Sequence, residues 1–367
     1  MALARERFFD QGERPRGLVG DSVIQSWERC LRIGLQPHHR PEFEPVSRAR
    51  ALRAVDRNRS LLQAAEPECR QLEATLAGTR CKALLTDREG IVVAATASGG
   101  LAGTLLETAS RVGVYLGEPN FGCTAPGVTT YTGALSCVSG AEHFFGLLAP
   151  MHCAAAPVLD RHGQLAGVLD LSLEGQPFAF DALALVQWTA LAIEQRLFLA
   201  QSRQDIVLRL QFQPALLGSP MAGLLALDED GRVQAINAQA ARLLGPQALP
   251  AAGAAVESLL GLGAAALRGR VMHGQPERLL LPNGLAAWVQ AVRLGAPDDA
   301  APAPAPPGPP LGAAPAPADN PARLRDAQED AIAAALARHQ GNVSRAARSL
   351  GVSRGLVYRH LKRNAGG

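Results

Sequence analysis

Residues 331–363 read AIAAALARHQGNVSRAARSLGVSRGLVYRHLKR, a pattern that predicts three consecutive helices. Gly341 suits the C-terminus of the first helix, and Asn342 and Ser353 suit the N-caps of the second and third. A helix-turn-helix needs a small residue where its helices cross and a glycine in its turn, and Ala347 stands four residues before Gly351. The stretch therefore predicts a helix-turn-helix, which reads DNA with its last helix.

The expected third helix presents a polar, basic face. The apolar positions expected on the buried side of the motif are Ala346, Leu350, Val352, Val357 and Leu361. Arg354 lies near the N-terminal end of the third helix, where it suits a bidentate contact with guanine, whereas Arg345, Lys362 and Arg363 suit phosphates. The expected DNA-contacting residues are Arg345, Ser353, Arg354, Gly355, Tyr358, Arg359, Lys362 and Arg363. The plainer alternative is a solvated helix face without a partner.

Charge is distributed unevenly along the chain. The 367 residues carry a formal net charge of +3, with 36 Lys and Arg against 33 Asp and Glu. After Asn320, nine basic residues stand against three acidic ones, so the tail carries +6 and the preceding 320 residues carry −3. A mildly acidic body with a small basic tail is typical of a nucleic-acid reader.

Composition favours a cytoplasmic protein that does not enter the membrane. Hydrophobic residues make up 47% of the chain, which is ample for a packed core. No apolar run reaches the ~20 residues that a bilayer requires. The first 17 residues are charged and lack the apolar core of a signal peptide. The six cysteines form no C-x-x-C pair, as expected for reduced thiols.

The body that precedes the tail alternates helical and strand patterns. The first expected helix presents an apolar face of Ser22, Val23, Ile24, Trp27 and Leu31. Strand pairs are expected around D-x-x-G turns at residues 87–90, 160–163 and 228–231. Apolar spacing from Asp181 to about Gln213 predicts one helix of ~30 residues, which would bridge two domains or pair with a second copy.

The tail pattern GN-x-x-x-AA-x-x-LGVSR-x-x-x-YR-x-LKR resembles the Fis-type helix-turn-helix that ends bacterial enhancer-binding activators. Two positions depart from that family, because Gly355 lies inside the recognition helix and Leu356 stands where threonine is common. The glycine would lower helix stability by up to ~1 kcal/mol. The resemblance implies a homodimer that reads an inverted repeat in double-stranded DNA.

The body resembles the sensory part of the acetoin-catabolism activator group within the same family. The resemblance rests on residues 24–35 (IQSWERCLRIGL), 140–144 (GAEHF), 153–158 (CAAAPV) and 167–172 (GVLDLS), and residues 216–245 resemble the opening of a PAS domain. It implies a multi-domain α+β fold, in which GAF and PAS-like α/β sensor domains joined by a long helix precede an all-α Fis-type helix-turn-helix. The expected divisions are a helical region 1–78, a GAF-like domain with its long helix 79–213, a PAS-like domain 214–295, a Pro/Ala-rich linker 296–321 and the helix-turn-helix 322–367.

Such sensor domains usually hold a ligand pocket on one sheet face, so the resemblance implies a small-molecule effector. The effector's identity does not carry over, because residues 122–129 read GCTAPGVT where the family commonly has G-T-N-x-x-G-T-A. The candidate ligand-binding residues are Phe121, Cys123, Thr124, Tyr131, Glu142, His143, Phe144 and Cys153. For these aromatic and cysteine side chains the plainer alternative is core packing. Neither a cofactor nor a metal is expected, since the Cys and His spacing of residues 137–153 matches no standard zinc pattern.

Full-length activators of this family carry an ATPase between sensor and tail, but the phosphate-binding motif G-x-x-x-x-G-K-[ST] is absent from this chain. We therefore expect a non-enzymatic, ligand-responsive regulator without intrinsic ATPase activity, acting by repression or by direct contact with RNA polymerase. One alternative is an ATPase-less partner that modulates a full-length sigma-54 activator through mixed dimers. A second alternative is an enzyme that uses Cys123 or Cys153 as its nucleophile.

Overall fold

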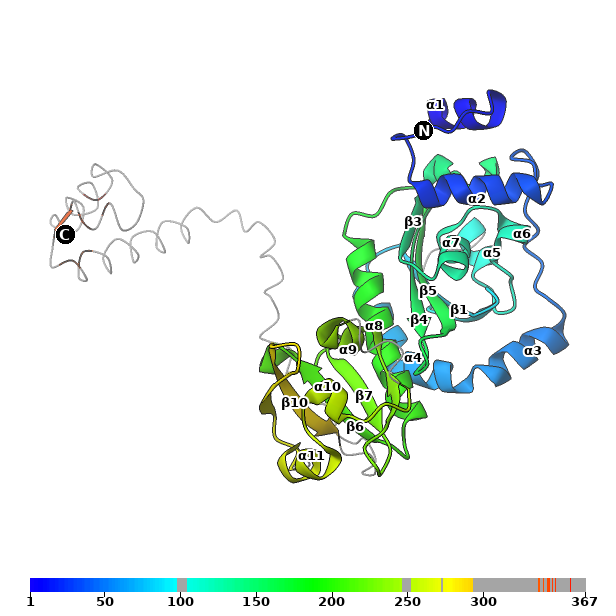
Figure 1. Ribbon diagram of the computed structural model, residues 1–367. Coiled ribbons are helices and arrows are strands. Elements are labelled where there is room, and N and C mark those ends of the chain that lie inside the picture. Colours follow the sequence, from blue (N-terminus) through cyan, green and yellow to red (C-terminus); the bar gives the residue numbers. More distant parts are fainter. Residues whose placement is uncertain are drawn as a thin grey trace. The chain divides into compact units, whose positions relative to one another are not determined.

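The computed structural model describes residues 1–97, 104–245, 252–271 and 273–292, together with seven positions of the tail. Those positions are Leu336, His339, Asn342, Val343, Arg345, Ala347 and Val357. The chain divides into two compact units, Met1–Ala296 and Pro297–Gly367, which are described separately. Within the first unit, two antiparallel five-stranded sheets form (Figure 1).

The first sheet has the strand order β2-β1-β5-β4-β3. Its strands are β1 (Lys82–Asp87), β2 (Val92–Ala95), β3 (Ser136–Ser139), β4 (Met151–Leu159) and β5 (Leu165–Glu174). The turn between β1 and β2 is closed by Asp87, whose Oδ1 accepts hydrogen bonds at 2.9 Å from the backbone N–H groups of Glu89 and Ile91. Asp160 closes the β4–β5 turn in the same way. Both strand pairs expected around D-x-x-G turns in this region are therefore confirmed.

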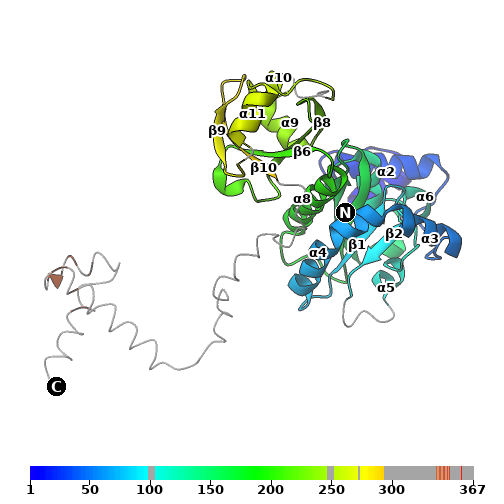
Figure 2. The same ribbon diagram turned by 90° about the horizontal axis from the view of Figure 1, so that it is seen from below.

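Helices cover both faces of the first sheet. One face packs against α4 (Arg59–Leu76) and α8 (Ala182–Gln201) around a core that includes Leu72, Leu169 and Val186. The opposite face packs against α2 (Asp21–Arg32), α5 (Leu105–Ala109), α6 (Glu118–Phe121) and α7 (Ala125–Thr132). Figure 1 shows α8 on one side of the sheet and α5, α6 and α7 on the other, and Figure 2 shows α5, α6 and α8 from below. The remaining short elements of this region are α1 (Ala2–Arg5), the π-helix η1 (Glu6–Asp10), α3 (Arg48–Arg57) and the 3₁₀ turns η2 (Gly140–Glu142) and η3 (Gly146–Leu148).

Helix α2 buries only part of the face that the sequence predicts, because Ser22 and Leu31 are exposed. Val23, Ile24 and Trp27 are buried, but Leu31 is 38% exposed and Cys30 is fully buried in its place. Residue 30 lies seven positions after Val23, which is two helical turns, whereas residue 31 is rotated by a further 100° toward solvent. The assignment of Leu31 to the buried face was therefore wrong.

The expected helix from Asp181 to Gln213 is also wrong in its second half. Helix α8 ends at Gln201, and residues 206–211 form strand β6 (Ile206–Gln211), which pairs on both sides within the second sheet. The apolar run Ile206-Val207-Leu208 is compatible with a strand buried on both faces and also with a helix, so its spacing alone does not distinguish strand from helix. Residues 202–205 therefore separate helix α8 from strand β6.

The second sheet has the order β8-β7-β6-β10-β9. Its other strands are β7 (Gly223–Leu227), β8 (Val233–Ile236), β9 (Glu277–Leu280) and β10 (Ala286–Val292), and its helical elements are η4 (Pro214–Leu216), α9 (Ala238–Leu244), α10 (Glu257–Leu260) and α11 (Ala264–Val271). The expected hairpin around residues 228–231 is confirmed, and helix α9 follows it. The central strand β6 precedes this hairpin in the chain, whereas the central strand β5 of the first sheet comes last. The two sheets thus reach a similar layout by different chain orders.

In the second unit, the structure describes isolated positions of the expected helix-turn-helix. Asn342 Oδ1 accepts a hydrogen bond of 3.1 Å from the backbone N–H of Arg345, as an N-cap side chain does. Leu336, Ala347 and Val357 are helical and buried. The expected cap at Asn342 and the expected burial of Val357 are thereby confirmed. The expected linker 296–321 lies outside the described residues.

Candidate functional site

A small cavity of about 30 Å³ lies on the face of the first sheet that α5, α6 and α7 cover. Its walls are mostly apolar, and its polar groups come from β4, β5, α7 and residues 140–145. The lining residues are Phe43, Leu84, Leu105, Leu106, Ala109, Leu116, Phe121, Thr124, Pro126, His143, Leu148, Met151, Cys153, Asp170 and Ser172. An apolar cavity with a few convergent polar groups is the usual form of a small-molecule site.

Strand alternation places the polar groups of this cavity side by side. Successive side chains of a strand point to opposite faces, so Asp170 and Ser172 of β5 share one face. The antiparallel register sets Ser172 opposite Cys153 of β4, and Asp170 opposite Leu84 of β1. Cys153, Ser172 and Asp170 therefore meet at the centre of the sheet without any contribution from a loop.

These side chains lie in a row and form two hydrogen bonds, which meet where Ser172 contacts Cys153. Ser172 Oγ donates to Asp170 Oδ2 at 2.6 Å and lies 3.1 Å from Cys153 Sγ. Cys153 Sγ lies 3.5 Å from Nε2 of His143, whose Nδ1 lies 2.9 Å from the carbonyl oxygen of Gly140. Because a carbonyl only accepts, Nδ1 of His143 carries the proton, and Nε2 accepts from the Cys153 thiol.

Burial determines the protonation of this chain. Burial raises the pKa of Asp170 to about 7, although the hydrogen bond from Ser172 acts in the opposite direction. Burial also lowers the pKa of His143 to about 4, so the imidazole is neutral at pH 7. The pKa of the Cys153 thiol is raised well above its ordinary value for the same reason. The chain therefore suits hydrogen bonding to a bound molecule, since a reactive thiolate would require a lowered thiol pKa.

The loop before α7 forms one wall of the cavity. Gly122 has φ +63°, and a Cβ there would lie 2.7 Å from the Cβ of Phe144, so glycine fits both the backbone and the packing. Thr124 caps α7, because its Oγ1 accepts a hydrogen bond of 3.1 Å from the backbone N–H of Gly127. Pro126 lies in the first turn, where its missing N–H costs nothing. The sequence GCTAPGVT at residues 122–129 is therefore explained by a tight turn and a helix N-terminus.

The N-terminal segment holds the loop that carries His143. The Arg5 guanidinium donates hydrogen bonds to the carbonyl oxygens of Ala141, His143 and Phe144 at 2.7–3.1 Å. Trp27 Nε1 donates to the carbonyl oxygen of Glu142, in the same loop, at 2.7 Å. These four bonds fix the loop from outside and so fix the position of the imidazole inside the cavity.

A buried ion pair joins α2 to the cavity wall. Arg29 and Glu118 form two hydrogen bonds, of 2.5 and 2.7 Å, and Ser26 Oγ donates to Glu118 Oε1 at 2.6 Å. The side chains of Arg29 and Glu118 are 14% and 9% exposed. The Arg29 guanidinium also lies 3.7 Å from the ring centroid of Tyr131 on α7. The hydrogen bonds with Glu118 raise the pKa of Arg29, so the guanidinium remains charged.

The structure brings four of the eight candidate ligand-binding residues to the cavity: Phe121, Thr124, His143 and Cys153. The other four serve the surrounding structure. Cys123 is buried beside Ser26, Phe144 packs edge-on against Phe9 and Phe145, and Glu142 accepts from the backbone N–H of Ser139. Tyr131 is 66% exposed beneath Arg29.

Two polar residues of the cavity, Asp170 and Ser172, were missed at the sequence level. The available signal was a carboxylate within the apolar run GVLDLSL of residues 167–173, at a position that strand alternation assigns to a buried face. A carboxylate is almost never fully buried unless it has a partner or a function. Asp170 is fully buried, and its Oδ1 has no hydrogen-bond partner within the described part of the chain.

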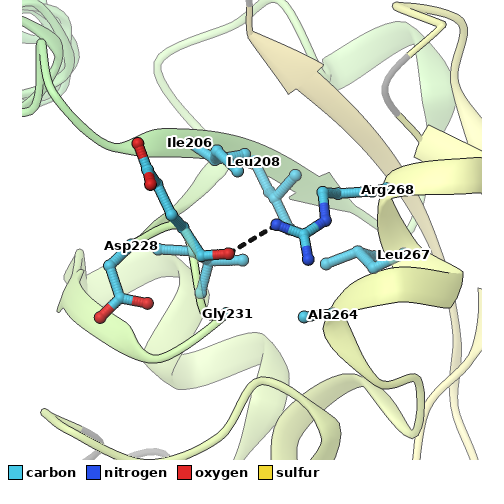
Figure 3. Close-up of a pocket in the computed structure, with 9 residues that line it drawn as sticks. Ile206, Leu208, Asp228, Gly231, Ala264, Leu267 and Arg268 are labelled. Carbon is cyan, nitrogen blue, oxygen red and sulfur yellow. Dashed lines mark hydrogen bonds between the residues drawn. The ribbon is translucent and has the colours of Figure 1, made fainter.

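A smaller pocket of about 10 Å³ lies in the second sheet region (Figure 3). Arg268 Nη1 donates to the carbonyl oxygen of Glu229 at 2.5 Å and closes it, as the dashed line in Figure 3 marks. The carboxylate of Asp228 is occupied by the hairpin turn, since it accepts from the backbone N–H groups of Asp230 and Arg232. The polar groups at this pocket therefore have structural roles.

Of the expected DNA-contacting residues, the structure describes Arg345 alone, which is helical and exposed. The other seven lie outside the described residues, namely Ser353, Arg354, Gly355, Tyr358, Arg359, Lys362 and Arg363. Among the described residues, no three His, Cys, Asp or Glu side chains gather as metal ligands. No described helix combines the length and the apolar character needed to span a membrane.

Comparison with known families identifies the class of the protein first. Residues 323–363 match the helix-turn-helix of the bacterial regulatory protein Fis family. The chain thus has a mixed α+β fold, with a sensor-like N-terminal region and a Fis-type helix-turn-helix. Residues 1–189 match the MimR N-terminal domain, and since this model covers more than half of the chain, the protein belongs to that family.

The relatives are transcriptional regulators. The acetoin catabolism regulatory protein of Cupriavidus necator is 32% identical over 245 residues, which cover 65% of this chain and 37% of the relative. The propane 2-monooxygenase operon transcriptional activator MimR of Mycolicibacterium smegmatis is 26% identical over 53% of this chain and 32% of its own length. The chain therefore spans about a third of the length of the relatives it matches. A crystal structure of the E. coli DhaR(N)-DhaL complex aligns with a TM-score of 0.46 at 18% identity, over 74% of this chain and 99% of the other.

Proposed function

We propose that the protein is a ligand-responsive transcription regulator, in which the cavity of the first sheet senses a small molecule and the Fis-type tail binds DNA. The observation that carries this proposal is the buried Asp170–Ser172–Cys153–His143 chain in an otherwise apolar cavity. A chain of buried polar groups that served only packing would be costly to retain, because an apolar core is as stable or more so.

The region from Lys82 to Gln201 is proposed to be a GAF domain and the region from Ile206 to Val292 a PAS-like domain. In support, each holds a five-stranded antiparallel sheet with helices packed on it. The names of the relatives refer to acetoin, glycerol, propane and dihydroxyacetone, all of which are small molecules. A small uncharged metabolite would also suit the apolar cavity described above.

The active form is proposed to be a homodimer that reads an inverted repeat. Helix α8 supports this, because it is apolar around most of its circumference. Its outer side leaves Trp188 50% exposed, and Leu185 and Leu191 are half-buried. An apolar stripe of this kind on a surface helix is typical of a protein interface.

The tail is proposed to contact bases through Ser353, Arg354, Gly355, Tyr358 and Arg359, and phosphates through Arg345, Lys362 and Arg363. Residues 296–321 would act as a linker that lets two tails reach one site. Output would come from repression or from direct contact with RNA polymerase, without ATP hydrolysis by this chain, since no phosphate-binding motif occurs in its 367 residues.

The lack of a phosphate-binding motif in the sequence also favours a second candidate function, in which the protein forms mixed dimers with an ATPase-containing relative and modulates it. Co-purification separates the two candidates. Recovery of such a relative, together with weak DNA binding by the isolated chain, would favour the second candidate. A stable homodimer that binds DNA alone would favour the first.

The proposed DNA-binding role is tested by a gel shift with genomic fragments at ~50–100 mM salt, where phosphate contacts are strong. Wild-type protein should retard a subset of fragments, and Arg354→Ala should lose the preference for that subset. Arg40→Ala is the matched control, because Arg40 is an exposed arginine of the body. Retardation of no fragment by the wild type would refute the proposal.

A further inference from the structure

We propose that Asp170 anchors the effector, and that the effector is a small uncharged molecule that donates a hydroxyl group to Oδ1 of Asp170. The inference rests on the proposed function, because it names the chemical group that the sensor would recognise. It also assigns the anchoring role to a residue outside the candidate set drawn from the sequence.

The hydrogen bonds around Asp170 leave one acceptor available. The single hydroxyl proton of Ser172 is directed at Oδ2, with an O···O distance of 2.6 Å. Oδ1 has no partner among the residues that the structure describes, and Asp170 lines the cavity. A buried polar atom left without a partner is costly, so it calls for a group that is absent from the protein itself. A hydroxyl donor in the cavity would supply that group.

The remaining polar groups of the cavity are already paired. The Cys153 thiol faces Nε2 of His143, and Nδ1 of His143 faces the Gly140 carbonyl. Thr124 is engaged in the cap of α7. Selectivity for a polar group of the ligand therefore rests on Asp170 more than on its neighbours.

The lining of the cavity favours an uncharged ligand. None of the lining residues is a lysine or arginine, and the walls consist largely of leucine, phenylalanine and methionine side chains. A cation would have to lose its hydration to enter, and one carboxylate with a single hydrogen bond would repay little of that cost. The carbon skeleton of an alcohol, in contrast, gains from contact with Phe121, Leu106 and Met151.

The test compares three four-carbon probes of similar length on the full chain at pH 8: 1-butanol, which donates a hydroxyl; 2-butanone, which only accepts; and n-butylammonium, which is charged. Binding is followed by the methyl resonance of Met151, which lines the cavity. We expect 1-butanol to bind roughly tenfold more tightly than either other probe, since an unsatisfied buried acceptor costs about that factor. Equal binding of butanol and butanone, preference for the ammonium, or binding of no probe would overturn the inference.

Variants assign the preference to Asp170. Asp170→Ala should lose the distinction between butanol and butanone. Thr86→Val is the matched control, since the Thr86 hydroxyl is equally buried and also without a described partner but does not line the cavity. A preference retained in Asp170→Ala, or lost in Thr86→Val, would contradict the assignment. If Asp170→Ala does not fold, the wild-type comparison of the three probes still decides.

The failure of this inference can be separated from the failure of the proposed function. Retardation of genomic DNA fragments, measured on the same preparation, reports the tail and not the cavity. Specific DNA binding without any butanol preference would overturn the inference alone. A butanol preference without DNA binding would overturn the proposed regulator and leave the ligand chemistry standing.

Discussion

The hydroxyl of Ser172 donates a 2.6 Å hydrogen bond to one carboxylate oxygen of Asp170 and leaves the other without a described partner in an apolar cavity. The two residues lie two positions apart on β5 and so share a face. This pairing fixes the orientation of the carboxyl group and directs its second oxygen to the cavity. The pH dependence of stability and the proposed ligand preference both depend on this pairing.

The free energy of unfolding should depend on pH because Asp170 is buried. Its folded-state pKa of about 7 lies above the ordinary 3.8, so between pH 4 and 7 the folded state retains a proton that the unfolded state has released. Stability from this group is therefore present at low pH and is lost as the pH rises toward 7, by at most about 1.4 kcal/mol per pH unit. Asp170→Asn removes the effect.

Urea unfolding of wild type and Asp170→Asn at pH 5 and pH 8 measures this contribution. The free energy of unfolding of the variant, relative to wild type, should be higher at pH 8 than at pH 5 by a few kcal/mol at most. Glu194 also has a pKa raised to about 7 by burial, but it is common to both proteins and cancels in the comparison. A difference between the two proteins that does not change with pH would contradict the burial of an ionisable Asp170.

In the ion pair between Arg29 and Glu118, each charge should depend on the other, so that loss of either one destabilises the protein. Removing either partner leaves the other charge largely buried, so Arg29→Ala and Glu118→Ala should each destabilise the protein by roughly 3 kcal/mol. The double variant should cost clearly less than the sum of the two, as measured by urea unfolding at pH 7. Additive losses would mean that the two side chains act independently. The exposed pair Arg59 and Asp56 serves as the control, and its removal should change little.

The cysteines should differ sharply in reactivity. Cys30, Cys123 and Cys153 are buried and Cys137 is exposed. Burial raises the pKa of Cys30 to about 12 and also raises those of Cys123 and Cys153, which disfavours their thiolates. Under native conditions iodoacetamide should therefore modify Cys137 first, as mass spectrometry of peptides will report, and Cys137→Ser should remove this modification. Fast labelling of Cys123 or Cys153 would instead revive the alternative of a cysteine nucleophile.

The proposed dimer depends on the outer side of α8. Trp188→Glu places a charge at the centre of the apolar stripe and should shift the protein toward the monomer in sedimentation or light scattering. Arg196 lies on the same helix and pairs with Glu68 within the chain, so Arg196→Lys is a control that should leave the oligomeric state unchanged. A Trp188→Glu protein that remains as associated as wild type would place the interface elsewhere.

Much of the first sheet could be predicted from its sequence because local chemistry determines it. The aspartate and glycine of each D-x-x-G turn both act within four residues, so the turns at residues 87–90 and 160–163 were placed correctly. The end of α8 could not be predicted in the same way. Residues 206–211 become a strand because β7 and β10 pair with it, and both follow later in the chain.

The candidate site was only partly predictable for a related reason. Glycines, caps and aromatic residues at positions 121–145 stand out in the sequence, and some of them do line the cavity. The row of polar side chains instead depends on the register between β4 and β5, which sets Cys153 opposite Ser172. That register follows from long-range pairing, so the local pattern of residues 167–173 indicates that Asp170 is buried but not which side chains it meets.

The central claim is that a Fis-type tail on this sensory body makes the protein a sequence-specific DNA binder. The most direct measurement is selection of genomic fragments by the full-length chain, followed by sequencing of the bound DNA, for wild type and Arg354→Ala in parallel. We predict that wild type enriches an inverted repeat and that Arg354→Ala loses this enrichment while keeping weak, salt-sensitive binding. Enrichment of no common sequence by the wild type, or of the same repeat to the same degree by the variant, would contradict it.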